Sequence, residues 1–156
     1  MRILFIIISA VLLFAATLVW GIISPSYSKG KQLRSLLLNA SKVSAHEYGI
    51  SRHDRTYDEI LTRKDLMPQQ IAAISDSFSV LGWIDAGKAC DFIPHHQLIC
   101  TMKDGSTHLI HLCFTCGDIA IDSGVAFDMM LWEESLKKNF LEAGIPVRTE
   151  SYRHDR

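Results

Sequence analysis

The segment QLICTMKDGSTHLIHLC, residues 97–113, contains two short aliphatic runs joined by the tripeptide KDG at 103–105. Apolar runs bounded by turn residues are typical of β-strands, and an Asp-Gly pair between them is a strong hairpin signal. We therefore predict an antiparallel hairpin with strands at 97–102 and 107–114. A third strand-like run follows at 118–121.

The length of the turn decides which side chains share a face of this hairpin. In a three-residue loop Gly105 takes the left-handed conformation, and His95 rather than His96 lies opposite Cys113. This register also gathers four apolar side chains on one face, namely Leu98, Cys100, Ile110 and Leu112. A two-residue turn gives a poorer core, so we predict the three-residue loop.

Other parts of the chain supply helices and one further strand. Apolar residues recur at helical spacing in three segments, namely between residues 30 and 41, after Asp65, and over 128–143. Asp65 can cap the second of these predicted helices. The buried face of the last helix is predicted to consist of Trp132, Leu136, Phe140 and Ala143. A weaker strand-like pattern covers 42–50. Strands followed by a covering helix predict an α+β domain, a small antiparallel sheet of three to four strands with helices packed on one face.

The N-terminus predicts where the protein resides. Residues 3–23 carry no charge over 21 positions, which is enough for a helix to span the ~30 Å hydrocarbon core of a bilayer. The length of this run and Trp20 near its end favour a retained N-terminal transmembrane helix over a removed signal peptide. Ser26 and Ser28 leave cleavage after Ser28 open as the alternative.

Length and charge set the class of the remaining chain. We divide the protein into a transmembrane anchor or signal segment at 1–28 and a single soluble α+β domain at 29–156, because 128 residues suit one domain. Sixteen Lys and Arg against seventeen Asp and Glu give a net charge of −1 without a basic stripe. We therefore expect no nucleic-acid partner.

The charges around the apolar run bear on its orientation. Lys29, Lys31 and Arg34 follow the run, whereas only Arg2 and the α-amino group precede it. The positive-inside bias would place the domain on the cytoplasmic side. A very short N-terminal tail with one Arg is also how uncleaved signal anchors begin, and we expect the domain to be exported.

A cluster of cysteines and histidines is the only chemistry-bearing feature. Cys90, His95, Cys113 and Cys116 are predicted to meet at one end of the sheet, while Cys100 is a buried strand residue. Thiolates and imidazole suit a tetrahedral divalent ion, so these four residues form a candidate metal site, with zinc as the candidate ion. In an oxidising compartment the cysteines would instead form disulfide bonds. A redox-active pair of Cys113 and Cys116 is a third interpretation.

The segment CDFIPHH at 90–96, followed by CFTC at 113–116 and GIP at 144–146, resembles a loose group of small uncharacterised bacterial proteins. These are exported or membrane-anchored and contain a Cys-Phe-x-Cys element. The resemblance covers 90–146. It implies a bacterial origin and points to the same four site residues, but it implies no activity.

No catalytic signature accompanies the cluster. The sequence has no Gly-x-Ser-x-Gly, no phosphate-binding glycine-rich loop and no His-Glu-x-x-His. We therefore predict a non-catalytic, single-pass protein of the bacterial inner membrane with a periplasmic domain. It would bind a protein partner or a metal through the cluster. The alternative is a thiol-disulfide oxidoreductase or metal-thiol enzyme that uses Cys113 and Cys116, with His95 as a base or ligand.

Overall fold

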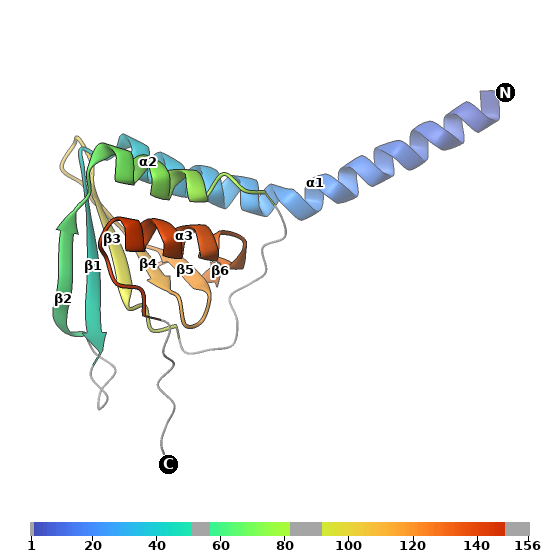
Figure 1. The fold of residues 1–156 in the computed structure, drawn as a ribbon. Helices are drawn as coiled ribbons and strands as arrows, with labels where there is room; N and C mark the ends of the chain where they lie inside the picture. The colour runs from blue at the N-terminus through green and yellow to red at the C-terminus, as the bar shows by residue number, and fades with distance from the viewer. Residues whose placement is uncertain (1, 51–56, 82–91, 149–156) are drawn as a thin grey trace, which may run out of the picture.

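The computed structural model describes residues 2–50, 57–81 and 92–148 of the 156-residue chain. Within these residues it contains three helices and one six-stranded antiparallel sheet (Figure 1). The elements are α1 (Arg2–Asn39), β1 (Lys42–Ile50), β2 (Tyr57–Asp65), α2 (Pro68–Ser77), β3 (His96–Thr101), β4 (Thr107–Cys113), β5 (Asp118–Ile121), β6 (Phe127–Asp128) and α3 (Met130–Glu142). The α+β class is confirmed, whereas the prediction of three to four strands is wrong.

The sheet is larger than predicted because two of its strands carry a weak sequence signal. The strand order is β2-β1-β3-β4-β5-β6, so β2 lies at one edge and β6 at the other. β2 has the sequence YDEILTRKD, in which charged residues break any apolar alternation. Charged residues keep an exposed edge from pairing with other chains. β6 has only two residues, too few for any period to show.

The predicted capping role of Asp65 is wrong, because the pairing of β1 with β2 extends to this residue. Asp65 is the partner of Ser44 in the sheet, and its carboxylate accepts a hydrogen bond from the Ser44 hydroxyl at 2.6 Å. α2 begins later, at Pro68. Its first turn is closed by Gln70, whose side-chain oxygen accepts a hydrogen bond from the Met67 N–H at 2.9 Å.

The hairpin of β3 and β4 has the predicted three-residue loop. Leu98 pairs with Ile110, and Gly105 takes a φ of 86°, in the left-handed region. The four side chains predicted to form the core face are all fully buried, namely Leu98, Cys100, Ile110 and Leu112. A register shift of one residue would have turned this whole set to the other face.

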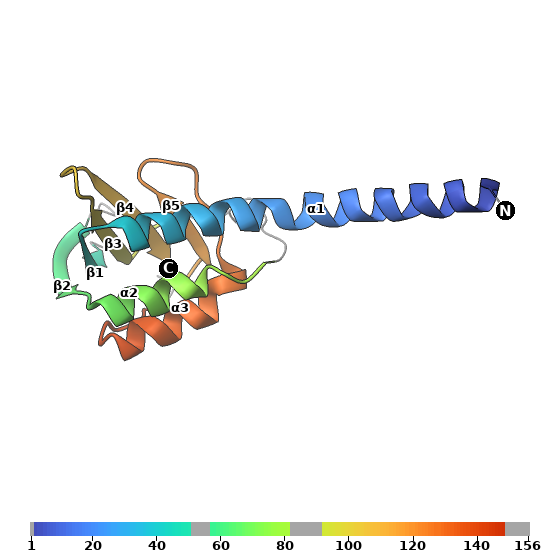
Figure 2. The same ribbon diagram turned by 90° about the horizontal axis from the view of Figure 1, so that it is seen from above.

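α1 is longer than either of the helices predicted within it, since it runs without interruption from Arg2 to Asn39. It bends by 40° between the segments Ile6–Gly21 and Ser24–Asn39, next to Pro25, which removes one backbone hydrogen bond from the helix. Figure 2 shows the first segment extending away from the domain and the second lying along it.

The length and apolar character of α1 were compared with what a membrane-spanning helix requires. Among the residues described, no single straight helix is long and apolar enough to cross a bilayer. The bent pair of segments in α1 meets the requirement by length and composition. A straight transmembrane helix at residues 3–23 is therefore unconfirmed.

The core lies between the sheet and the helices, which cover one face of the sheet (Figures 1 and 2). Trp132 of α3 is fully buried in this core. Its ring lies edge-on to Phe78 at a centroid distance of 5.3 Å and to Phe127 at 6.4 Å. Its indole N–H donates to the carbonyl of Val80 at 3.0 Å. This one side chain therefore joins α3 to the residues that directly follow α2 and to β6.

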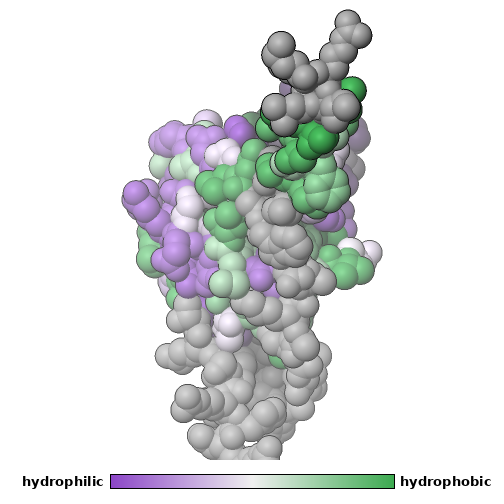
Figure 3. Space-filling view, turned by 90° about the vertical axis from the view of Figure 1, so that its right-hand side faces the viewer, coloured by the Kyte–Doolittle hydropathy of each residue, from purple (hydrophilic) through white to green (hydrophobic). Residues whose placement is uncertain are grey.

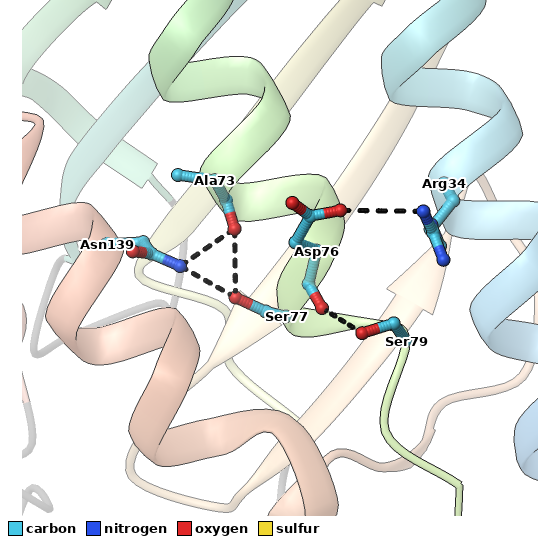
Figure 4. A network of polar contacts seen from close by, with 6 residues as sticks. All are labelled: Arg34, Ala73, Asp76, Ser77, Ser79 and Asn139. Carbon is cyan, nitrogen blue, oxygen red and sulfur yellow. Dashed lines mark hydrogen bonds and ion pairs between the residues drawn. The ribbon is translucent and has the colours of Figure 1, made fainter.

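Polar side chains join the helices to one another (Figure 4). Asn139 of α3 donates from Nδ2 to the carbonyl of Ala73 at 2.8 Å and to the Ser77 hydroxyl at 2.9 Å, both on α2. On the other side of α2, Asp76 lies 3.4 Å from the Arg34 guanidinium of α1. These contacts fix α2 between its two neighbours.

Gly30 of α1 lies in a tight contact with Phe78, the residue that directly follows α2. A Cβ at this position would lie 2.4 Å from the carbonyl oxygen of Phe78, a backbone atom that cannot rotate away. A Cβ at Gly21, on the same helix, would meet nothing within 4 Å. The two glycines thus form a matched pair, one in a tight contact and one in open space.

Replacing Gly30 with alanine is expected to lower the free energy of unfolding by about 1–3 kcal/mol, because the extra methyl group overpacks the contact. Both substitutions gain about 1 kcal/mol of helix propensity, because alanine favours a helix more than glycine does. Gly21→Ala makes this gain without a clash and is therefore expected to lose no stability. Chemical denaturation of both full-length variants in one detergent checks this. Equal stability of the two variants would contradict the tight contact at Gly30.

Candidate functional site

Three of the four predicted site residues lie in the described part of the chain, and Cys90 lies outside it. His95 directly precedes β3, Cys113 ends β4, and Cys116 lies in the turn before β5. His95 and Cys113 stand one step beyond the last pair of the β3–β4 ladder. The register therefore places these two residues opposite each other, as predicted.

The cysteines of the described residues differ in chemical state. Cys100 and Cys113 are free thiols, whereas Cys116 is disulfide-bonded. Cys113 and Cys116 are therefore not joined as a Cys-x-x-Cys disulfide. Burial raises the pKa of the Cys113 thiol, whereas a redox-active thiol needs a lowered pKa. Both observations weigh against thiol exchange at Cys113.

Cys100 lies where the sequence predicted it, in the hydrophobic core. Its side chain is fully buried on the helix-covered face of β3. Burial raises the pKa of its thiol to about 12. The thiol therefore stays protonated and acts as a small apolar side chain.

The candidate metal site is described only in part. In the described segments no three His, Cys, Asp or Glu residues gather so that they could hold a metal ion. His95, Cys113 and Cys116 therefore form no such group on their own. Burial lowers the pKa of His95, which keeps its imidazole neutral near pH 7. Because a disulfide-bonded Cys116 has no thiolate to offer a metal ion, the four-residue site with Cys90 stays a prediction that would require Cys116 to be reduced.

A second polar cluster lies on the face of the sheet that the helices leave uncovered. It contains His46 and Tyr48 of β1, Gln97 of β3 and His111 of β4. In the register, His46 pairs with Gln97, and Gln97 pairs with His111. Ala45, directly before His46 on β1, belongs to the core, so His46 faces the opposite side of the sheet.

Three hydrogen bonds join these four side chains across three strands. The Tyr48 hydroxyl donates to Oε1 of Gln97 at 2.8 Å, so it accepts from Nδ1–H of His46 at 3.1 Å. The Gln97 amide donates from Nε2 to Nδ1 of His111 at 3.1 Å. These directions place the ring hydrogen of His46 on Nδ1 and that of His111 on Nε2.

The ionisable groups of this cluster are held neutral. Burial lowers the pKa of His46, with a further lowering from the Arg63 guanidinium, and burial also lowers the pKa of His111. Burial raises the pKa of the Tyr48 hydroxyl. The Gln97 amide in the middle of the chain does not titrate, so the cluster orients side chains and does not relay protons.

One atom of the cluster has no hydrogen-bond partner among the described residues. This atom is the buried Nε2 of His46, and the direction of the bond at Nδ1 leaves it as an acceptor. A buried unpaired acceptor costs about 1–3 kcal/mol. Sequence analysis missed His46, Tyr48 and Gln97, although the polar alternation of Ser44, His46 and Tyr48 was an available signal.

On the helix-covered face, buried polar groups hold residues 146–148 against the sheet. Glu47 of β1 accepts hydrogen bonds from Nε of Arg148 at 2.7 Å and from the Thr62 hydroxyl at 2.8 Å. His96 is fully buried, and its Nε2 donates to the carbonyl of Pro146 at 2.8 Å. The role of this group is structural, because it ties the end of the described chain to three strands.

In the described part of the chain, Cys113 is a buried, protonated thiol, and the side-chain partner of His46 is a phenol. Comparisons of the chain with protein-family models, with curated proteins and with solved structures found no match.

Proposed function

We propose that the protein is a non-catalytic binding module held on a membrane by the N-terminal half of α1. The observation that carries this proposal is the exposure of that half. Ten large hydrophobic side chains between Ile6 and Trp20 are 50–71% exposed. Leaving such a side chain in water rather than burying it costs about 1.5–3 kcal/mol, and the hydrocarbon core of a bilayer removes this cost.

The dimensions of α1 fit this role. From Arg2 to Gly21 the helix has a length of about 30 Å at ~1.5 Å per residue, which equals the hydrocarbon thickness of a bilayer. Trp20 and Tyr27, with ring centroids 6.3 Å apart, lie near the end of this half, and such aromatic side chains favour the membrane interface. Figure 3 looks at the domain from the side where α1 leaves and shows hydrophobic side chains over α1 and on the neighbouring surface.

We place partner binding on the uncovered face of the sheet. The buried amide of Gln97 orients the half-buried imidazole of His111, which is polar, while Ile99 and Leu109, paired across β3 and β4, add half-buried apolar area. Mixed polar and apolar surface is typical of non-obligate protein interfaces. A protein is therefore the class of partner that this face supports best.

Membrane attachment is tested by placing two charges in the middle of the exposed half. Leu12→Arg combined with Leu13→Arg is expected to abolish attachment, because each arginine at the centre of a spanning helix costs about 3 kcal/mol. Flotation of the full chain with lipid vesicles measures attachment. Val125→Arg, at a site 90% exposed in the loop before β6, is the control and should float like the parent. A parent chain that stays in the aqueous fraction would refute the proposal.

A further inference from the structure

We infer that the groove between α1 and the end of α2 binds the headgroup of an anionic phospholipid from the membrane that holds α1. This inference rests on the proposed membrane attachment. The groove has a volume of about 500 Å³. Its lining combines two cations with apolar side chains, namely Lys31, Arg34, Tyr27, Leu38, Phe78 and Leu81.

The groove begins at the level where the membrane surface would lie. Tyr27 lies at this end, and its ring is 6.3 Å from that of Trp20 in the exposed apolar half. Lys31 follows about 10 Å beyond Ser24 along α1. Helix side chains lean toward the N-terminus, here toward the membrane, so the Lys31 stem brings its ammonium group back to the headgroup layer.

The cations of the groove are available to an anion. Lys31 is exposed. Arg34 lies 3.4 Å from Asp76, but the side chains are 38% and 72% exposed, and such an exposed pair contributes little. Figure 4 shows the Arg34 guanidinium between α1 and α2, directed at Asp76. A phosphate group could accept two parallel hydrogen bonds from the Arg34 guanidinium. The ammonium group of Lys31 would attract it as a compact point charge.

The apolar part of the lining decides between a lipid and a soluble phosphate. Tyr27, Leu38 and Leu81 are 47%, 54% and 49% exposed, and the buried ring of Phe78 lines the groove with them. A free phosphate would leave this apolar surface in water. A phospholipid is amphipathic like the groove, so its phosphate would meet the cations while its glycerol and upper acyl chain would cover Tyr27 and Leu81.

The test uses the full chain reconstituted in bilayers of phosphatidylcholine with a minor fraction of phosphatidylglycerol. The lipid retained per chain after mild detergent extraction is measured by mass spectrometry, as enrichment over the bulk. We expect phosphatidylglycerol to be enriched. Lys31→Gln and Arg34→Gln should each lower this enrichment about fivefold. Asp76→Asn removes the competing carboxylate and should raise it.

The matched control is Lys103→Gln combined with Lys138→Gln, which removes two exposed cations outside the groove lining and should leave the enrichment unchanged. Flotation with pure phosphatidylcholine vesicles is measured in parallel. Loss of flotation by the parent would refute the membrane attachment itself. If the parent floats but phosphatidylglycerol is equally enriched in the parent and in the Lys31→Gln, Arg34→Gln double variant, membrane attachment stands and only the lipid site in the groove is overturned. Chemical cross-linking between copies of the chain is compared in the same samples. If the groove variants lose this cross-linking while the lipid enrichment is unchanged, the groove is a protein interface and the lipid inference is overturned.

Discussion

Trp132→Ala is expected to lower the free energy of unfolding by about 3–5 kcal/mol, a large part of the ~5–15 kcal/mol that stabilises a typical domain. Trp132 is fully buried, and its removal leaves a cavity beside Phe78 and Phe127. It also removes the donor that the carbonyl of Val80 uses. Urea denaturation followed by circular dichroism measures the loss.

Two variants separate the contributions to this effect. Trp132→Phe keeps most of the apolar ring but lacks the indole N–H, so it should lose less, about 1–3 kcal/mol. Leu141→Ala changes a residue that is 59% exposed on the same helix, and it should stay within about 0.5 kcal/mol of the parent. A Trp132→Ala variant as stable as Leu141→Ala would rule out the central role of Trp132.

Acidification from pH 7 to pH 4 is expected to cost about 3 kcal/mol of stability through His96 alone. Burial lowers the pKa of His96 from 6.5 to about 4, against the opposing hydrogen bond to the Pro146 carbonyl. A difference of one pKa unit corresponds to about 1.4 kcal/mol. Between these two values the unfolded chain binds more protons than the folded one. Stability is therefore full above pH 6.5 and falls as the pH decreases toward 4.

The measurement is the urea midpoint at several pH values between 7.5 and 4. His46, His95 and His111 have pKa values lowered in the same direction, so they add to the slope. His96→Gln keeps a donor for the Pro146 carbonyl but cannot titrate in this range. It should therefore show a smaller pH dependence than the parent. Identical pH dependence in the parent and in this variant would exclude His96 as the titrating group.

Local chemistry made parts of the fold predictable. Gly105 and the apolar residues around it determine a single good register for the β3–β4 hairpin, and this register is confirmed. The buried face of α3 also follows from spacing alone, since Trp132, Leu136, Phe140 and Ala143 are all buried. In both cases the information lies within a few neighbouring residues.

Features that depend on distant parts of the chain were missed. β2 is a strand because it pairs with β1, not because its charged sequence favours one. Residues 24–30 of α1 contain Pro25 and serines that indicate a boundary, yet packing against α2 at Gly30 keeps them helical. Tertiary contacts override local propensity in such segments.

In the candidate site, too, features that depend on neighbouring residues were predicted, and features that depend on distant residues were not. The sequence placed Cys100 in the core correctly because its strand neighbours are apolar. It left the state of Cys113 open, because a thiol pKa depends on burial that only the folded chain sets. The network of His46 and Gln97 requires the register of strands separated by about fifty residues, information that no local pattern contains.

The continuity of α1 determines how the domain is presented to its surroundings. Leu33 and Leu37, in the second segment of the helix, are locked into the core at 0% and 1% exposure. This second segment therefore cannot turn about its own axis without moving the sheet with it. Because the helical backbone continues from this segment into the N-terminal half, a change in the tilt of that half would also change the direction in which the uncovered face of the sheet is presented.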